Sequence, residues 1–575
     1  MTSTVLELDL TVPLLESPPQ DPIGAVLHRR RPLLRDLVEG LRLAAYDPSV
    51  TGLVAHVGGQ GPTFAQVQEL RAAVRVFADA GKPTVAWSET YGEFGPGTLP
   101  YYLASAFDQV WLQPSGDLGL TGIMAEAVFV KDALTKLGVV PEMSRRHEYK
   151  NAADTFLATQ MSDAHREAAG RLAASAMEQV VDGIVTHRKL SSVQVRELVD
   201  RSPLSAKDAL ASGLVDRLGY RDEVYADLRR RLGEVTFRYV QRYRQARQLE
   251  PRQALARLQR SPGVAVVHGT GPIHLGRSSR RGLASTSIGS DTAAGALRAA
   301  AADPKVRAVV LRVDSPGGSY VASDAVRREV VRVRDAGKPV VVSMGTVAAS
   351  GGYFVSMAAD SIVAQPGTLT GSIGVFGGKA VVRDMLDRVG IARDGVTEGR
   401  NAAMFSAYHR FTADEWRRLE DWLDQVYDDF TAKVAVDRGL SRDHVEKAAR
   451  GRVWTGADAR ERGLVDELGG FERAVEIACA RVGIGREEAA LRYPARVGMV
   501  ERLRGPESSE RAATAAAGLG AGLAARLGAG LGAGLTEGLG LPATSGPARM
   551  LAELTSAFGL GHAGVLTAPV LWELR

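Results

Sequence analysis

The sequence predicts an α/β fold that is built twice along one chain. Apolar strands alternate with amphipathic helices, as in the segment 293–318, and this alternation is typical of parallel βαβ units. A second observation is repetition, since D-P-S-V-T-G-L-V-A-H-V at 47–57 returns as D-P-K-V-R-A-V-V-L-R-V at 303–313, an offset of 256 residues. The length of 575 residues also exceeds what one hydrophobic core usually holds. We therefore expect two α/β domains in tandem.

Two further repeats keep the same order. The segment 112–122, L-Q-P-S-G-D-L-G-L-T-G, corresponds to A-Q-P-G-T-L-T-G-S-I-G at 364–374, an offset of 252. The pattern A-x-x-x-G-L-V-D-x-L-G occurs at 209–219 and again at 459–469, an offset of 250. Because the offset shrinks only through small deletions, we interpret the chain as a tandem duplication.

The elements follow from this duplication. Each copy begins with an alternating strand, at 4–12 and 263–271, and continues through helix, strand and Gly-rich turn. We expect the N-terminal domain to cover 1–250 and the C-terminal domain to cover 262–490. The segment 221–262, rich in Arg and Gln, is expected to link the two copies.

The last part of the chain, 491–575, has a different composition. Residues 512–541 are mostly Gly, Ala and Leu, and the longest stretch without charge, 512–525, has 14 residues. A membrane-spanning helix needs about 20 residues, and frequent Gly weakens a helix. We interpret this low-complexity tail as a flexible linker to a short terminal helix, with a peripheral contact to a membrane or a partner as the alternative.

Composition limits the classes of function. The chain carries 71 basic and 66 acidic residues in an interleaved order, which does not resemble a nucleic-acid-binding surface. The single Cys479 excludes an internal disulfide. The sequence lacks the H-E-x-x-H and Walker A motifs, so we expect neither a metal nor a nucleotide cofactor. The N-terminus lacks a secretory-signal pattern, and we expect a cytoplasmic protein.

Two positions break the symmetry between the copies. Ser350, in A-A-S-G-G-Y, corresponds to Thr98, and Lys150, in H-E-Y-K-N-A-A, corresponds to Arg400. One copy therefore holds a candidate nucleophile and the other a candidate base.

Ser350 follows a predicted strand and turn and is expected to open a helix. A helix N-terminus favours developing negative charge, which suits a nucleophile. The alternative is that Ser350 only caps the helix or permits close packing.

Lys150 is unusual because only 11 of the 71 basic residues are Lys. A guanidinium keeps its proton near neutral pH, whereas a desolvated ammonium can lose it and act as a general base. A solvated surface lysine is the alternative. The chain has no G-x-S-x-G motif, and His147 lies in no comparable catalytic motif, so a Ser-Lys pair is the simplest interpretation.

The turn D-S-P-G-G-S at 314–319 follows another predicted strand. Paired glycines let two backbone N–H groups face one point, and such a nest can bind the oxyanion of a tetrahedral intermediate. An ordinary tight turn is the alternative. The matching V-G-G-Q-G-P of the first copy lacks the pattern.

Together, D-S-P-G-G-S, A-A-S-G-G-Y, L-T-G-S-I-G-V and E-Y-K-N in a duplicated chain resemble the signal peptide peptidase SppA family, in its long bacterial form, over about 3–485. The resemblance implies ClpP/crotonase-like domains and a serine endopeptidase with a Ser-Lys dyad. Ser350 would be the nucleophile and Lys150 the general base.

The resemblance implies further roles. Ser372, in T-G-S-I-G, would orient the lysine amine, and Leu120 is its first-copy counterpart. Gly317 and Gly318 would form the oxyanion hole, with the N–H of Gly351 as a helper.

The resemblance also implies a bowl-shaped homotetramer that accepts extended peptides, including remnant signal peptides. Duplicated relatives typically carry an N-terminal membrane anchor and none is visible here, so cytoplasmic peptides are the alternative substrates. A crotonase-type acyl-CoA enzyme and a non-catalytic oligomeric scaffold are the rival functions. The asymmetric pair Ser350 and Lys150 weighs against both.

Overall fold

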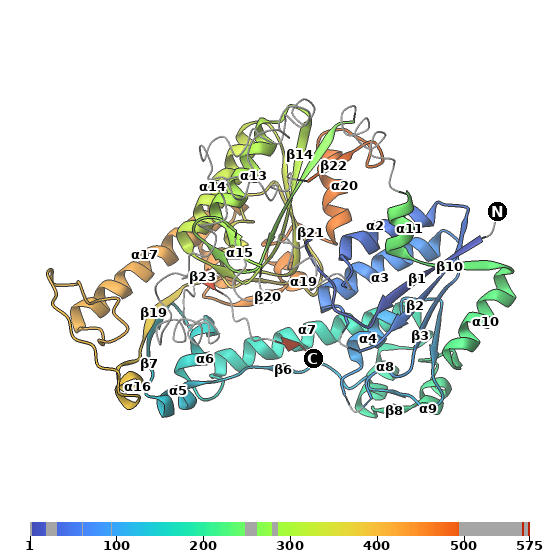
Figure 1. Cartoon of the computed structure of the whole chain (residues 1–575), viewed down its shortest axis with the longest axis horizontal. Helices are drawn as coiled ribbons and strands as arrows, with labels where there is room; N and C mark the ends of the chain where they lie inside the picture. Colours follow the sequence, from blue (N-terminus) through green and yellow to red (C-terminus); the bar gives the residue numbers. More distant parts are fainter. Residues whose placement is uncertain are drawn as a thin grey trace, which may run out of the picture.

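The computed structural model describes residues 3–18, 31–59, 61–93, 95–247, 261–278, 286–493, 566–567 and 573–574. Two large sheets, one from each copy, form its two halves, and helices pack against both (Figure 1). The predicted α/β class is therefore confirmed.

The first sheet has six strands that are all parallel. In sheet order they are β10 (Val235–Tyr239), β1 (Ser3–Leu10), β2 (Val50–Val57), β3 (Thr84–Ser88), β4 (Gln109–Leu112) and β9 (Arg217–Leu218).

The second sheet has eight strands, of which only β20 runs antiparallel to its neighbour. Six follow one path: β20 (Val453–Thr455), β18 (Leu369–Gly371), β16 (Val340–Ala349), β14 (Val306–Ser315), β11 (Gly263–Thr270) and β22 (Ala490–Arg492). Off that path, β17 (Ser361–Ala364) pairs with β16 and with β21 (Glu467–Leu468).

Short strands make four smaller sheets. One joins β13 (Ile288–Gly289), β12 (Ile273–His274), β15 (Gly317–Gly318) and β23 (Leu566–Thr567); the others pair β19 (Phe376–Val381) with β7 (Val140–Arg145), β24 (Glu573–Leu574) with β6 (Ala125–Glu126), and β5 (Asp117–Leu118) with β8 (Leu204–Ser205).

Helices connect the strands of both copies. The first copy has α2 (Leu34–Ala45), α3 (Phe64–Asp79), α4 (Thr98–Ala104), α5 (Lys131–Leu137), the 3-10 helix η1 (Asn151–Ala153), α6 (Asp154–Leu157), α7 (Asp163–His187), α8 (Ser192–Asp200), α9 (Ala206–Ala211), α10 (Arg221–Leu232) and α11 (Val240–Arg247). The second has α13 (Ser290–Ala302), α14 (Tyr320–Asp335), α15 (Gly351–Phe354), α16 (Arg383–Arg388), α17 (Ala413–Arg438), α18 (Arg442–Ala448), α19 (Gly456–Glu461) and α20 (Phe471–Arg481).

The inner strands of each sheet are apolar and largely buried, as expected for parallel sheets that helices cover on both faces, whereas the edge strands β10 and β9 are partly exposed. Caps define the long helices: Ser162 accepts a hydrogen bond from the His165 N–H at the start of α7, and Thr412 forms a capping box with Glu415 at the start of α17. Each sheet with its helices therefore encloses its own hydrophobic core.

An arm of the first copy crosses to the second. Strand β7 pairs antiparallel with β19 over six residue pairs, from Val140↔Val381 to Arg145↔Phe376, and the Arg146 N–H donates to the Val375 carbonyl. In Figure 1 the teal β7, α5 and α6 lie beside β19 and α16, away from the blue sheet of their own copy. Helix α7, about 37 Å long at 1.5 Å per residue, returns the chain to that copy.

Residues 221–247 were expected to begin a linker, and that expectation is wrong. They form α10, β10 and α11, and β10 is the edge strand of the first sheet, paired with β1. The Arg-rich composition reflects solvent-facing helix surfaces: Arg229, Arg230 and Arg231 lie in the last turn of α10, where positive charge suits the helix dipole.

A buried ion-pair group joins the copies. The Arg312 guanidinium of β14 lies 2.9 Å from the Glu16 carboxylate and 3.1 Å from that of Glu69, and both acids belong to the first copy. Glu69 also accepts the Phe471 N–H at 2.9 Å. Removing one partner of such a buried pair typically costs about 3–5 kcal/mol, because the other charge is then left buried without compensation.

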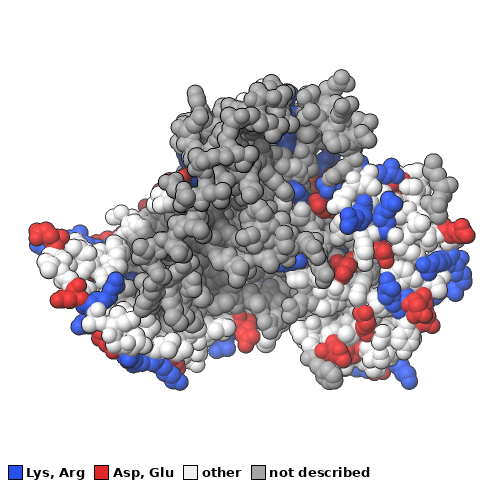
Figure 2. Space-filling model, in the orientation of Figure 1, with Lys and Arg blue, Asp and Glu red and all other residues white. Residues whose placement is uncertain are grey.

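On the exposed surface, Lys and Arg lie beside Asp and Glu at both ends of the molecule, as the interleaved sequence indicates (Figure 2). Among the helices that the structure describes, none is long and apolar enough to cross a membrane. Most of the predicted flexible tail, 494–565, lies outside the described residues, but β23 and β24 near its end pair with β15 and β6.

Candidate active site

Lys150 and Ser350 lie next to each other although 200 residues separate them. The Lys150 Nζ is 2.8 Å from the Ser350 Oγ, which is hydrogen-bond distance. Both side chains are fully buried. The two residues come from the two copies of one chain, because the β7 arm carries Lys150 across to the second copy.

Burial lowers the pKa of the Lys150 amine well below its ordinary 10.5. Within the described part of the chain, no carboxylate forms an ion pair with this amine that would restore its charge. The environment therefore favours the neutral amine, which is the form that can accept a proton.

Ser372 contacts the lysine amine twice. Lys150 Nζ donates to the Ser372 Oγ at 3.0 Å and to the Ser372 carbonyl at 3.2 Å, and the Ser372 hydroxyl donates to the Gly451 carbonyl at 3.3 Å. A neutral amine has two N–H donors and one lone pair. Since the two oxygens of Ser372 take the donors, the lone pair is left facing Ser350.

Two glycines make room for the lysine. A Cβ on Gly451 would lie 2.6 Å from the Lys150 Cβ, and Gly451 has a left-handed backbone with φ of +85°. A Cβ on Gly374 would lie 2.6 Å from the Gly451 Cα and 3.4 Å from the Lys150 Cδ. The lysine therefore packs directly against backbone.

Ion pairs hold the arm around Lys150. Arg145 pairs with Asp154, on the other side of Lys150 in the chain. Arg450, beside Gly451, pairs with Glu148 at 2.8 Å, and this contact holds the Glu148 pKa below its ordinary value. The Glu148 pair joins the first-copy arm to the second copy, so it positions Lys150 relative to Ser350.

Ser350 has a strained backbone, with φ of +56° and ψ of −114°. Its N–H donates to the Gly371 carbonyl at 2.8 Å and its carbonyl accepts the Phe354 N–H. The predicted helix after Ser350 is present, but α15 has only four residues, so the helix-dipole argument contributes little. The strain places Ser350 at an abrupt strand-to-helix turn, a geometry that persists where surrounding structure enforces it.

The predicted oxyanion-hole glycines lie against Gly351, the residue after Ser350. A Cβ on Gly351 would meet the Gly317 Cα and the Gly318 N, each at 3.0 Å. The Gly317 N–H donates to the Ser315 Oγ at 3.1 Å. Gly318 has a φ of +155°, and any Cβ there would collide with the Ile273 backbone, so the tight turn needs glycine.

The first copy lacks such a pair at the matching place. Thr98 starts α4, where its hydroxyl donates to the Gly122 carbonyl at 2.9 Å, and Leu120 is a buried core residue. Arg400 is exposed on the second copy. The difference between the copies that the sequence indicated is therefore also present in the structure, where only one serine and one lysine of the matching positions lie together.

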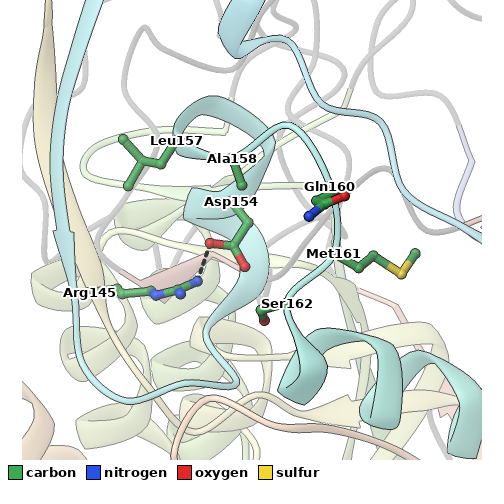
Figure 3. A pocket seen from close by; sticks show the side chains of 7 residues that line it. All are labelled: Arg145, Asp154, Leu157, Ala158, Gln160, Met161 and Ser162. Carbon is green, nitrogen blue, oxygen red and sulfur yellow. Dashed lines mark hydrogen bonds and ion pairs between the residues drawn. The ribbon is translucent and has the colours of Figure 1, made fainter.

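A pocket of about 420 Å³ lies on the loop that carries Lys150 (Figure 3). The Arg145–Asp154 ion pair forms one side, and the residues that follow α6 form the rest. Neither Lys150 nor Ser350 lines it, so the pocket is distinct from the dyad.

Comparisons with known proteins agree with this geometry. The sequence profile of Peptidase family S49 matches residues 76–236 and 332–484. The chain belongs to peptidase family S49. Because the profile matches twice, at corresponding positions of the two copies, the predicted duplication is confirmed, and this S49 peptidase is a serine protease that hydrolyses peptides.

Curated relatives extend over most of the chain. Protease 4 of Salmonella typhi is 35% identical over 458 residues, which are 77% of this chain and 71% of that protein. Protease 4 of Haemophilus influenzae is 33% identical over 77% of this chain and 72% of its own length. The chloroplastic serine protease SPPA of Arabidopsis thaliana is 30% identical over 78% of this chain and 66% of its own length. The predicted membership of the SppA family is confirmed.

Among solved structures, a point mutant of ClpP1 from Listeria monocytogenes aligns with 36% of this chain and 93% of its own, with 14% identity and a TM-score of 0.24. The α/β class itself rests on the two parallel sheets. Membership of the S49 family decides against the acyl-CoA enzyme and the non-catalytic scaffold as functions.

Several residues around the dyad were not predicted from the sequence. Arg450 and Gly451 lie in no motif that the sequence marks, and Gly374 and Ser315 lie within the quoted motifs T-G-S-I-G and D-S-P-G-G-S but without a predicted role. Gly451 follows α18, and only the fold brings it to Lys150.

Proposed function

We propose that this S49 peptidase cleaves peptide bonds with Ser350 as nucleophile and Lys150 as general base. The observation that carries the proposal is the buried 2.8 Å contact between the Lys150 Nζ and the Ser350 Oγ. In the first step the Ser350 Oγ attacks the peptide carbonyl carbon while its proton passes to the neutral amine of Lys150.

The tetrahedral intermediate then collapses. The bond between carbon and nitrogen breaks, the leaving amine takes the proton from the Lys150 ammonium, and an ester with Ser350 remains. A water gives a proton to Lys150 and attacks the ester carbon; the bond between that carbon and the Ser350 Oγ then breaks, the Lys150 ammonium returns the proton to the Oγ, and the acid is released. Ser372 orients the lysine amine throughout, through its two contacts with the Nζ.

Backbone N–H groups stabilise the oxyanion in this proposal. Gly318 and Gly351 lie together beside Ser350. Gly317 becomes a third donor when its N–H no longer donates to the Ser315 Oγ. Such donors contribute about 3–4 kcal/mol each in well-studied acyl transfer.

Inactivation and labelling test the dyad. Ser350→Ala and Lys150→Ala are each expected to reduce peptide hydrolysis below a few percent without unfolding the protein. A fluorophosphonate probe is expected to attach to Ser350 of the wild type, as located by peptide mass spectrometry. More than a few percent activity in either variant would refute the assignment.

The substrates are proposed to be extended peptides, with remnant signal peptides and cytoplasmic peptides as the two sources, and a cytoplasmic location stays a prediction. The division into domains 1–250 and 262–490, and a peripheral membrane contact of the tail, are likewise proposals. Hydrolysis of a peptide library by purified protein, compared with hydrolysis of synthetic signal peptides, separates the two substrate classes.

A homo-oligomer is supported by the arm exchange. The duplication offset of 252 maps β19, which receives β7, onto the region of β6. The offset of 250 maps the arm strand β7 onto 390–395, in which every residue but Ile391 is exposed. By this symmetry, we infer that 390–395 of one chain pairs with β6 of the next, and a head-to-tail contact of this kind gives a ring when the rotation between the chains closes. The family resemblance favours four chains.

Exposed apolar side chains lie at both segments of the proposed contact, β6 and 390–395. Met124 and Val128 flank β6 with exposed fractions of 54% and 49%, and Val396 beside the second arm is fully exposed. Light scattering after gel filtration is expected to give a tetramer for the wild type and a smaller species for Val396→Asp. An unchanged mass for Val396→Asp would contradict this interface.

A further inference from the structure

Strand β16, which leads to Ser350, contains a β-bulge opposite β14. Between the pairs Val313↔Met344 and Ser315↔Ala348, β14 has one residue and β16 has three. Extra residues on one strand bend it and turn the residues that follow, and such bulges are common next to active sites. After the bulge, β16 continues to Ser350, and β14 continues to the proposed oxyanion-hole turn.

The single residue of β14 at the bulge is Asp314, and its carboxylate binds the bulge. The Val347 N–H donates to the Asp314 Oδ1 at 3.0 Å, and the Thr346 N–H also hydrogen-bonds to this carboxylate. A Cβ on Gly345 would lie 2.8 Å from the Asp314 Cβ and 3.0 Å from its Cγ and Oδ1, so the close approach of the carboxyl requires glycine there. One side chain of β14 therefore holds the bulged backbone of β16.

The first copy has no such carboxyl. At the offset of 256, Asp314 corresponds to Gly58 and Gly345 corresponds to Glu89. In the first copy, hydrogen bonds within 88–90 hold the end of the strand instead. The pair of acid and glycine is therefore present only in the copy that carries the proposed nucleophile.

A second aspartate binds the other end of the same strand. The Val340 N–H, at the start of β16, donates to the Asp360 Oδ2 at 2.8 Å. This contact recurs in the first copy, where the Thr84 N–H donates to the Asp108 Oδ2 at 3.0 Å. A contact that both copies contain stabilises the fold that they share, whereas a contact confined to the second copy is expected to concern the reaction.

The charged groups around Asp314 come from both copies. Removal from solvent and the charge of Glu16 raise the pKa of Asp314 to about 7, although Arg312 acts in the opposite direction. Glu69, whose pKa burial also raises, contacts Arg312 at 3.1 Å. Strand β16 has no charged residue, and on β11 burial lowers the pKa of His268 to about 3, so that this ring stays neutral. The Asp314 carboxylate therefore predominates above about pH 7 and is lost as the pH falls.

We propose that Asp314 is a positioning residue for peptide hydrolysis: its carboxylate fixes the bulge of β16 and thereby sets the place of Ser350 relative to the oxyanion-hole turn. Three residue steps separate Asp314 from Gly317, and three separate Val347 from Ser350, so the contact joins the two strands close to their reacting ends. Hydrogen bonds to an ionised carboxylate are roughly twice as strong as neutral ones. The proposal rests on the proposed function, because it takes Ser350 as the nucleophile.

Two matched substitutions at opposite ends of β16 test this role. Asp314→Asn keeps the shape of the side chain but replaces one acceptor oxygen by an NH2 group, which cannot accept a backbone N–H. Since a misplacement of about 1 Å can cost about 100-fold in rate, kcat for a fluorogenic peptide is expected to fall about 30-fold with KM little changed. The control Asp360→Asn removes a carboxylate contact to the far end of β16 and is expected to keep the wild-type kcat, although thermal unfolding should show a loss of stability in both variants. Equal kcat values in the two variants would overturn the proposal.

The pH dependence separates positioning from a general loss of stability. Deprotonation of Lys150 affects the wild type and Asp314→Asn alike, so it cancels in the ratio of their kcat values. This ratio is expected to be largest above about pH 7, where the carboxylate is ionised, and to shrink toward one as Asp314 takes up a proton. A ratio that stays constant as the pH falls through this range would overturn the role of the carboxylate.

Gly345→Ala tests the contact from the other strand. The new Cβ would displace the Asp314 side chain, and kcat is expected to fall about tenfold. The control Gly295→Ala, where a Cβ meets nothing within 4 Å, should match the wild type. Gly345→Ala should have little further effect in Asp314→Asn, because the positioning contact is already lost; the same fold-loss in both backgrounds would contradict the proposal. Activity in Ser350→Ala would instead contradict the proposed function and leave the contact between Asp314 and the bulge standing.

Discussion

Gly451→Ala tests how closely the backbone holds Lys150, the proposed general base. The new Cβ would lie 2.6 Å from the Lys150 N and Cβ and 2.7 Å from its Cα, whereas ordinary contacts begin at 3.4 Å. Since these atoms belong to the backbone or lie next to it, the Lys150 segment has to move by about 0.8 Å. A misplacement of about 1 Å at a catalytic group can cost about 100-fold in rate. We therefore expect kcat to fall about 50-fold, with KM little changed.

The control for this substitution is Gly439→Ala. Gly439, after α17, also has a left-handed backbone with φ of +63°, but a Cβ there meets nothing within 4 Å. Both variants carry the backbone penalty of about 1–2 kcal/mol, which thermal unfolding measures. Only Gly451→Ala adds the displacement of Lys150. Steady-state kinetics on a fluorogenic peptide separates the two, and a Gly451→Ala enzyme with more than half of the wild-type kcat would refute the reasoning.

Three further predictions concern the same site. Lys150→Arg is expected to be as inactive as Lys150→Ala, because a guanidinium cannot accept the proton. The rate of the wild type should rise with pH, and the midpoint of this rise should report a Lys150 pKa well below 10.5. A midpoint near 10.5 would contradict the argument that burial lowers the Lys150 pKa. Lys150→Met should raise the free energy of unfolding near neutral pH. The folded pKa lies below the unfolded one, so unfolding takes up a proton between the two values and the wild type loses stability as pH falls through that range. The difference should vanish above about pH 10.5, and denaturant titrations at several pH values check it. Ser372→Ala removes one acceptor of the Lys150 N–H groups and is expected to lower kcat about tenfold. Ser372→Ala should also move the rising limb of the pH–rate profile to lower pH, because the Ser372 hydroxyl stabilises the Lys150 ammonium and its loss lowers the Lys150 pKa. An unchanged limb would show that Ser372 does not orient the amine.

The fold class and the contact between Ser350 and Lys150 could be predicted from the sequence because both leave local or repeated patterns. Alternating strands and helices mark βαβ units, and the copies served as internal controls for each other, which made Ser350 and Lys150 stand out against Thr98 and Arg400. The roles predicted for Ser350 and Lys150 came from their chemistry together with the family resemblance.

The remaining features depend on contacts between distant segments. Pairing of β7 with β19 joins residues more than 200 positions apart, and the sequence of neither strand indicates which strand it pairs with. The same holds for β23 on β15 and for the fit of Gly451 against Lys150. Residues 221–247 were predicted to be part of a linker because a high Arg content is typical of linkers. Strand β10 forms there because it pairs with β1, a contact that the local sequence does not reveal.

The exchange of β7 also sets how many reaction centres an assembly holds. A copy that receives an arm with a lysine, and itself carries a serine, is complete; a copy that receives Arg400 and carries Thr98 and Leu120 is chemically silent. In the proposed ring, every second α/β unit is therefore silent, and four chains hold eight units but four centres. Because the silent units do not have to carry out proton transfer, the residues on their inner surfaces can change in sequence and take a role in guiding a polypeptide from one reaction centre to the next.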